Sequence, residues 1–368
     1  MLGRVSDRAA NPNLARQRPP WGAAAVAGAW LLALLGGTAA TRWAESDAGN
    51  PLSLGRSVFL TANALTLTGF DADFAGQRGW LTAGLLAVGI ACAWTVAGGA
   101  VQRALSTQQL LTRSAAVLLV ASLVASVFSW NVTHALAAVG GAGLHDLPPA
   151  TSSVWLVLFP LAAAGALGPA AWAGRASLKN RTLRLNLTGM AAAFVVSLVW
   201  LAVWNGPTPD VAALALDARH GGFTSAAASP IDRWTLVPIV LLGTAGGGAG
   251  GGLKVTTAVV LLAGLWRLYR GGSVGRTFAI AATWLALLVA LFGVTFVLLT
   301  RALPALPVDR VALLAAGAVG NVGLSVAPVS AAGLDAYILA AAMTLGRALP
   351  WGIIWWSAVA GDEDIAVG

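Results

Sequence analysis

The chain has 368 residues, of which 58% are hydrophobic and only 10% are charged. A soluble domain ordinarily carries about 25% charged residues, so this composition excludes an ordinary soluble domain and predicts a protein surrounded by lipid. The net charge of +8 does not indicate a nucleic-acid partner, because the arginines occur in short clusters along the chain and form no basic face. One cysteine and three histidines exclude an intramolecular disulfide and a dense metal site.

The apolar residues are gathered into eight runs, each close to the length of about 20 residues that a helix needs to cross a bilayer. The first run follows a basic segment, residues 1–20, and is too long for the core of a signal peptide. We therefore interpret it as the first membrane helix. The eight expected spans are residues 22–41, 79–100, 114–130, 152–173, 187–204, 234–266, 278–299 and 334–357.

A shorter apolar segment lies between the two spans of each pair and is too short to cross. These expected short helices are residues 58–66, 132–139, 211–218 and 310–318. The order of span, short helix, turn and span therefore occurs four times, which predicts an all-α polytopic membrane protein with four repeats around a central pseudo-fourfold pore. The expected divisions are a tail at 1–20, repeats at 21–102, 103–180, 181–272 and 273–360, and a tail at 361–368.

Each short helix is followed by a turn in which a glycine precedes Phe or Leu. The four turns are Thr68-Gly69-Phe70, Ala142-Gly143-Leu144, Gly221-Gly222-Phe223 and Val322-Gly323-Leu324. Non-helical backbone at membrane depth must be buried in protein or line a cavity. Rings of backbone carbonyls can replace the water around a dehydrating cation, and glycine permits the backbone angles that aim them inward. The four turns therefore predict a cation pore.

Lysine and arginine cluster between the repeats, which predicts that these loops and both chain termini are cytoplasmic. The turns then face outside, together with several aspartates that would raise the local cation concentration, among them Asp232 and Asp335. The charge bias is imperfect, because four arginines fall on the outer side: Arg42, Arg56, Arg301 and Arg310.

The sixth span is interrupted by a run of glycines, which no continuous helix accommodates. The run ends in GGLKVTT, and a phosphate-binding loop is excluded because Leu253 separates Gly252 from Lys254. A flexible glycine strand at mid-membrane favours a mobile plug beneath the pore, with a gate loop at residues 244–254. Charges inside a bilayer are costly and usually functional, which directs attention to Lys254 and Arg347. The alternative for Lys254 is a side chain that extends to the cytosolic edge.

These motifs resemble those of the Trk/Ktr/HKT superfamily of potassium transporters over nearly the whole chain. The segment GGGAGGGLKVTT, residues 246–257, is similar to the glycine-rich break in the third repeat of that superfamily. Thr66-Leu67-Thr68-Gly69-Phe70 resembles the first filter turn, ARHGGF (218–223) the third and GNVGLS (320–325) the fourth. Gly346-Arg347-Ala348-Leu349-Pro350 resembles a motif of the last span. The second turn departs, because it has Gly140-Gly141-Ala142-Gly143-Leu144 where a pair of asparagines is common.

The resemblance implies potassium uptake through a filter of carbonyls, with a Ktr-like, eight-span pore-forming subunit. It implies filter turns at 66–70, 140–144, 219–223 and 320–324, with ion contacts at Thr66, Leu67, Thr68, Gly69, Gly141, Ala142, Gly143, Gly221, Gly222, Asn321, Val322 and Gly323. It implies a gate made of Gly246, Gly247, Gly248, Ala249, Gly250, Gly251, Gly252, Lys254 and Arg347, with Arg347 holding the loop. In this superfamily glycine in the first turn accompanies potassium selectivity, so Gly69 favours K⁺ over Na⁺.

The resemblance also implies a homodimer in a bacterial inner membrane, controlled by a cytosolic nucleotide-binding subunit. No bound cofactor is expected beyond the transported K⁺, and coupling to Na⁺ or H⁺ is left open. His220 stands where threonine is usual, and contact with the ion path would make uptake depend on pH. An enzyme is not expected, because the spans contain almost no nucleophile, base or metal ligand. The alternative function is a non-conducting scaffold or sensor that has kept the fold.

Overall fold

The computed structural model describes most of the chain outside the second repeat. It covers residues 21–47, 49–70, 79–101, 181–208, 232–245, 248–324 and 329–359, with isolated residues at 115–116, 119–120, 136–137, 139–140, 163, 165–167, 211, 214–215 and 218–219. The expected spans at 114–130 and 152–173 therefore lie largely outside the described residues. Within the described part, the regular elements are helices, and a single β-bridge joins Leu242 to Leu253.

The first group of helices consists of α2 (Trp21–Asp47), α3 (Leu54–Leu65) and α4 (Gly79–Val101). Helix α3 begins at Ser53, whose side-chain oxygen accepts a hydrogen bond from the backbone N–H of Arg56 at 3.2 Å. Such an N-cap satisfies one of the free amides at a helix start. Helix α3 is too short to cross a bilayer, and ten of its twelve residues are buried.

The second group consists of α9 (Arg181–Asn205), α11 (Arg233–Leu241) and α12 (Val255–Tyr269). Helices α11 and α12 are the two halves of the sixth expected span. The break is longer than the glycine run alone, because α11 ends at Leu241 and α12 begins only at Val255. Between them the chain leaves the helical conformation, with φ −87° and ψ 98° at Leu242.

The third group consists of α13 (Arg276–Ala302), α14 (Val308–Gly320) and α15 (Leu334–Val359). Helix α14 corresponds to the short helix expected at 310–318, and ten of its residues are buried. It ends where Asn321 adopts the left-handed conformation, with φ 50°. A left-handed residue is a common way to end a helix and to turn the chain sharply.

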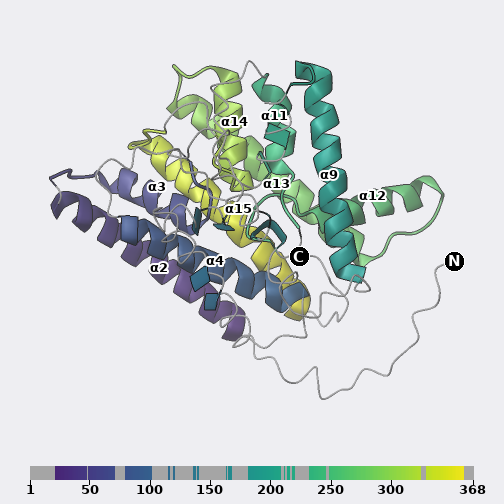
Figure 1. Ribbon diagram of the computed structural model, residues 1–368, viewed down its shortest axis with the longest axis horizontal. Helices are drawn as coiled ribbons and strands as arrows, with labels where there is room; N and C mark the ends of the chain where they lie inside the picture. Colours follow the sequence, from purple (N-terminus) through teal and green to yellow (C-terminus); the bar gives the residue numbers. More distant parts are fainter. Residues whose placement is uncertain are drawn as a thin grey trace.

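Helix α15 lies diagonally across the molecule, with α2, α3 and α4 on one side and α9, α11, α13 and α14 on the other (Figure 1). Both short helices, α3 and α14, pack against α15. Their shared core contains Phe59, Phe70, Leu339 and Met343. As a result, the turns that follow α3 and α14 meet in the interior beside α15.

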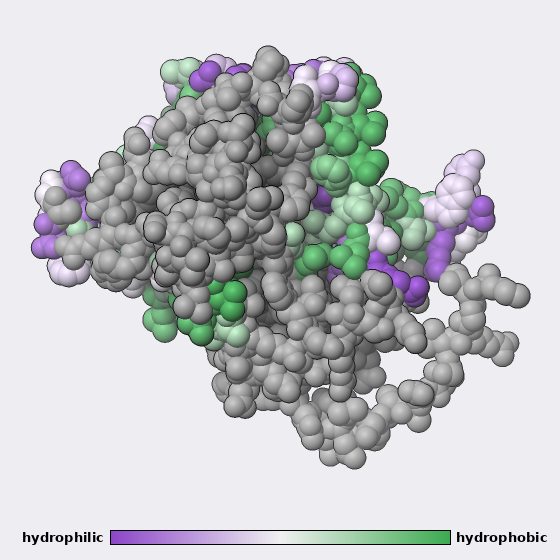
Figure 2. All heavy atoms as spheres, in the orientation of Figure 1, coloured by the Kyte–Doolittle hydropathy of each residue, from purple (hydrophilic) through white to green (hydrophobic). Residues whose placement is uncertain are grey.

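The outer surfaces of the long helices are apolar. On α9 the exposed side chains include Val195, Val196, Val199, Val203 and Trp204, and this face is green at the upper right of Figure 2. Residues Arg184–Asn205 and Arg276–Ala302 have the length and apolar character of membrane spans. In the most apolar 18-residue stretch of each, only 17% and 22% is buried inside the protein. Core helices of soluble proteins are mostly buried, so these exposed apolar faces agree with a lipid environment.

Candidate functional site

The first turn, residues 66–70, leaves the end of α3 as a tight, fully buried bend. Two of its residues have positive φ, with 59° at Leu67 and 73° at Gly69. Glycine adopts such angles without strain, whereas leucine does so at a cost. The N–H groups of Thr68 and Gly69 both donate to the carbonyl oxygen of Asn63, at 3.1 and 3.3 Å. These bonds tie the turn to the last turn of α3.

The side chain of Asn63 holds the end of the first turn. Its Nδ2 donates to the carbonyl oxygen of Phe70 at 2.9 Å, and its Oδ1 accepts from the N–H of Phe70 at 2.8 Å. The sequence analysis did not identify this residue. The sequence signal that could have identified it is an amide side chain in a short apolar helix just before a glycine turn. A buried amide at such a position needs hydrogen-bond partners.

The fourth turn, residues 320–324, lies directly against the first. A Cβ added to Gly323 would fall 2.6 Å from the backbone nitrogen of Phe70 and closer still to the carbonyl group of Gly69. Asn321 makes the second link, because its Nδ2 donates to Thr68 Oγ1 at 3.1 Å and to the carbonyl oxygen of Met343 at 2.8 Å. The two turns are therefore in backbone contact and fastened to α15.

Hydroxyl groups continue this network inside the first turn. Thr66 Oγ1 donates to the carbonyl oxygen of Ala62 at 2.6 Å and lies 2.7 Å from Thr68 Oγ1. The backbone between the two threonines is therefore braced by their side chains as well as by Asn63. A braced turn keeps its carbonyl groups in fixed positions, which is what selective coordination of a cation requires.

The break in the sixth span forms an inner loop, which the structure describes at residues 243–245 and 248–254. Its neck is the bridge between Leu242 and Leu253, with hydrogen bonds from Leu253 N to Leu241 O and from Gly243 N to Leu253 O, both at 2.8 Å. A third bond joins Val255 N to Thr244 O at 3.0 Å. The described glycines on either side of residues 246–247 therefore belong to a loop with a defined neck.

The inner loop packs against the fourth turn. A Cβ on Gly251 would fall 2.6 Å from Asn321 Oδ1, 2.7 Å from Asn321 Cβ and even nearer to the carbonyl oxygen of Gly320. Asn321 Oδ1 is buried there and has no hydrogen-bond partner among the described residues. On another side of the loop, the N–H of Ala249 donates to the carbonyl oxygen of Gly165 at 2.9 Å.

Lys254 lies inside the loop. Its Nζ donates to Gly248 O at 3.0 Å, to Thr244 Oγ1 at 3.2 Å and to Gly250 O. The ammonium group of Lys254 is therefore directed at atoms of the loop itself. A charge inside a membrane protein requires such partners, because its desolvation is costly.

Arg347 joins the inner loop to the first turn. From α15, its Nε and Nη2 donate to the carbonyl oxygen of Thr66 at 3.1 and 2.5 Å, and its Nη1 donates to the carbonyl oxygen of Ala249. The resemblance implied a contact between Arg347 and the loop, and its role in gating stays a prediction. The contact with Thr66 was not foreseen, and it brings a buried cation to the first carbonyl of the turn.

Arg219 holds the neck of the inner loop. It is buried, and its Nη2 donates to Gly243 O at 2.8 Å while its Nε donates to Leu242 O at 3.4 Å. The sequence analysis had noted this arginine only as part of the third turn. Three cationic side chains therefore bind the carbonyl groups of the inner loop at its neck, its interior and its tip.

Several predicted site residues lie outside the described residues. These are Gly141, Ala142, Gly143, His220, Gly221, Gly222, Gly246 and Gly247. The structure brings together the remaining ones: the first turn, the fourth turn, the inner loop from Gly248 onward, Lys254 and Arg347.

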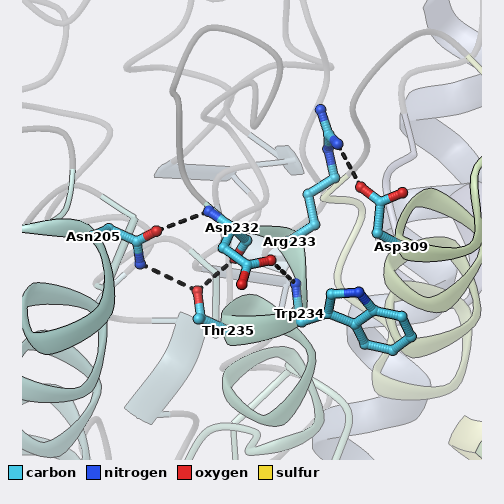
Figure 3. Close-up of polar contacts among 6 residues, drawn as sticks. All are labelled: Asn205, Asp232, Arg233, Trp234, Thr235 and Asp309. Carbon is cyan, nitrogen blue, oxygen red and sulfur yellow. Dashed lines mark hydrogen bonds and ion pairs between the residues drawn. The ribbon is translucent and has the colours of Figure 1, made fainter.

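The far end of α11 is fixed by a separate polar network. Arg233 Nη1 pairs with Asp309 Oδ2 at 2.5 Å, and Asn205 Oδ1 accepts from the N–H of Asp232 at 2.8 Å (Figure 3). Asn205 also donates to Thr235 Oγ1 at 3.2 Å. These contacts join the start of α11 to the end of α9 and to the start of α14.

The aspartates in this region serve local structure. Asp232 accepts from Trp234 N at 3.0 Å and caps α11, while Asp335 accepts from Gly333 N at 3.0 Å at the start of α15. The hydrogen bond from Arg233 lowers the pKa of Asp309 below its ordinary value of 3.8. Asp309 is thus held in an ion pair, while Asp232 and Asp335, two of the aspartates expected to attract cations, each accept a local backbone hydrogen bond.

Comparison with known proteins identifies the fold. No family model matches the chain, and no curated protein matches its sequence. Among solved structures, the chain is similar to the crystal structure of the potassium transporter TrkH from Vibrio parahaemolyticus, with a TM-score of 0.69 and 17% identity. The similarity covers 95% of this chain and 86% of that chain. The chain therefore has an all-α, polytopic membrane fold of the same kind.

Proposed function

We propose that the chain is a pore-forming subunit of the Trk/Ktr type that carries K⁺ across a membrane. The observation that carries this proposal is the backbone contact between Gly69 and Gly323, with the inner loop bound directly beside the two turns. Non-helical turns at membrane depth must be buried in protein or line a cavity, since lipid-exposed irregular backbone does not occur. A filter that lines an ion path meets this requirement. The likeness in fold to a potassium transporter supports the same reading.

The carbonyl groups of the first and fourth turns would supply half of the filter, and the second and third turns the other half. Helices α3 and α14 end at these turns, so their negative C-terminal ends favour a cation there. Gly69 has φ 73°, a conformation that a residue with a side chain would adopt only with strain. This conformation supports the proposal that Gly69 favours K⁺, because glycine keeps the backbone carbonyls of the turn in place without strain.

The inner loop would act as the gate. Its packing against Asn321 through Gly251 and its link to the first turn through Arg347 support a position beside the proposed ion path, and we propose that this is the inner end. Its neck and interior are held by hydrogen bonds to Arg219 and Lys254, which can break and re-form without unfolding a helix. Displacement of residues 248–251 alone would then clear the path.

Location and partners belong to the same proposal. The exposed apolar faces of α9 and α13 support a bilayer location, and we place the protein in a bacterial inner membrane with cytoplasmic termini. A homodimer and a cytosolic nucleotide-binding regulator are proposed from the resemblance. Whether K⁺ moves alone or with Na⁺ or H⁺ depends on side chains along the whole path.

The test is rubidium uptake, with potassium-dependent growth, in a bacterium that lacks its own potassium uptake systems. Wild type, Gly69→Ser and the control Gly293→Ser are compared at equal expression. Gly293 lies in α13 with open space around an added Cβ, so its substitution should be silent. Uptake by wild type, with loss of potassium preference only in Gly69→Ser, supports the proposal. No uptake by well-expressed protein, with a cytosolic partner supplied, would favour the non-conducting scaffold.

A further inference from the structure

Arg56 is a buried cation that the proposed ion path does not use. It is the third residue of α3, and only 9% of its surface is exposed. The first turn of a helix carries positive partial charge, so an arginine is unfavourable at this position. It is also one of the arginines that break the expected charge bias. Its burial at the start of α3 therefore requires strong and specific contacts.

Among the described residues, Arg56 contacts carbonyl groups of the return segment, residues 329–333, which leads from the fourth turn to α15. Its Nη1 donates to Val329 O at 2.6 Å and to Ala331 O at 3.3 Å. Ser53 Oγ donates to Ala332 O at 3.2 Å. Gly55 lies so close to the same segment that an added Cβ would fall 2.7 Å from Ala332 O. The start of α3 is thus bound to the return segment at three carbonyl groups, those of Val329, Ala331 and Ala332.

Arg56 also supports the first turn through a stack of aromatic rings. Its Cζ lies 5.5 Å from the centroid of the Phe59 ring, and Phe59 stacks on Phe70 with centroids 6.4 Å apart and planes inclined by 22°. Phe70 directly follows Gly69, and its ring lies against Gly317 of α14. Both rings are completely buried, so a continuous packed path joins Arg56 to the end of the first turn.

We propose that Arg56 is a positioning residue that holds the outer ends of the first and fourth turns at a fixed separation and thereby sets discrimination between K⁺ and Na⁺. A guanidinium suits this role, because its planar group stacks on an aromatic ring while it donates to two carbonyls. Carbonyl filters distinguish cations by the number and spacing of their oxygens. The inference rests on the proposed function, since the spacing matters only if cations pass between the turns.

The test compares Arg56→Met and Arg56→Lys with the matched control Arg310→Met. Arg310 is the third residue of α14 and is partly exposed, so the control removes the same charge from the corresponding position of the other short helix. The readout is the preference ratio, which is the Na⁺ concentration that halves rubidium uptake divided by the corresponding K⁺ concentration. Expression in the membrane is matched for all variants.

Arg56→Met should lower the preference ratio about threefold or more. Loss of a buried charge-assisted hydrogen bond can produce a larger change than this, so the expected fall is well within its range. Arg56→Lys, which keeps the charge and one donor, should lower the ratio less, and Arg310→Met should leave it unchanged. If Arg56→Met does not reach the membrane, Arg56→Lys carries the test and must still fall below wild type. An equal fall in Arg310→Met would overturn the inference, because loss of charge alone would then suffice.

Melting temperature separates failure of this inference from failure of the proposed function. The purified protein is melted in KCl and in NaCl at equal ionic strength, and K⁺ should stabilise wild type more than Na⁺ does. Arg56→Met should reduce that difference. Wild-type uptake with an unchanged ratio in Arg56→Met would overturn the role of Arg56 and leave the proposed function standing. Absence of wild-type uptake together with equal melting in the two salts would overturn both.

Discussion

Arg347 and Thr66 are 281 residues apart in the chain, yet two nitrogen atoms of the Arg347 guanidinium donate to the carbonyl oxygen of Thr66. The same guanidinium also donates to Ala249 in the inner loop. One side chain from α15 therefore couples the beginning of the first turn to the tip of the loop. A cation bound at Thr66 O would compete with this guanidinium, so the position of the loop and the occupancy of the filter are expected to depend on each other.

Replacement of Arg347 should open the proposed gate. In Arg347→Ala the loop loses its bond at Ala249, and we expect the initial rate of rubidium uptake to rise by about threefold or more, since one charge-assisted bond contributes about 1.5–3 kcal/mol. Arg347→Lys, which keeps the charge but not the planar fork, should lie between wild type and Arg347→Ala. Unchanged uptake in Arg347→Ala at normal expression would contradict a gating role.

A methyl group on the loop should have a similar effect. Gly251→Ala places a Cβ within 3 Å of Gly320 O and of the Asn321 side chain, so the loop must move away from the fourth turn. We expect faster rubidium uptake, measured as the initial rate at equal expression. Gly293→Ala is the control, because nothing lies within 4 Å of its added Cβ. A rate below that of this control would show that the displaced loop blocks the path.

A methyl group on the filter should have the opposite effect. Gly323→Ala places a Cβ against the backbone of Gly69 and Phe70, where no flexible side chain can yield. The first and fourth turns must separate, and we expect rubidium uptake to be nearly abolished. The same Gly293→Ala control applies, and membrane expression distinguishes a damaged filter from a missing protein. Normal uptake in Gly323→Ala would remove these two turns from the ion path.

Asn63 should determine the geometry of the first turn. In Asn63→Ala the N–H and the carbonyl of Phe70 lose their side-chain partners, at a cost of about 1–3 kcal/mol for each buried unsatisfied group. We expect a lower melting temperature and a weaker preference for K⁺ over Na⁺. The control is Ser57→Ala in the same helix, because the only partner of the Ser57 hydroxyl among the described residues is Ser53 O, at 3.1 Å. A change in preference that is equal in both variants would contradict a specific role for Asn63.

The ion pair of Arg233 and Asp309 predicts how stability depends on pH. The folded pKa of Asp309 is lowered, so the contribution of the pair is complete above the ordinary value of 3.8 and is lost as the pH falls below it through the lowered pKa. The melting-temperature difference between wild type and Asp309→Asn should therefore be constant between about pH 5.5 and 7.5 and should shrink only below about pH 4. Shrinkage at neutral pH would contradict this assignment.

Contact of His220 with the ion path would make uptake depend on pH between about 5.5 and 7.5. The measurement is rubidium uptake across this range in wild type and in His220→Thr. Loss of the dependence in the variant is the expected result. A dependence that persists in His220→Thr would exclude this histidine.

The sequence predicted those features that depend on neighbouring residues. The length of the apolar runs placed α4, α13 and α15 within a few residues of their observed bounds, because a bilayer-spanning helix must satisfy its backbone internally. The glycine run marked the break between α11 and α12, although the break begins earlier, at Leu242. The glycines at 69 and 323 were recognised because a tight turn after a short helix restricts the residue type.

Only the tertiary structure decided which of these segments touch. The contacts of Arg347 with Thr66, of Gly323 with Gly69 and of Arg56 with Val329 join residues from distant parts of the chain. A backbone carbonyl can accept a hydrogen bond whatever its side chain is, so the sequence carries no mark of the carbonyls that these arginines select. The sequence alone therefore determined the helices, the turns and the need to satisfy buried charges. The packing of α3 and α14 around α15 determined which partners satisfy them.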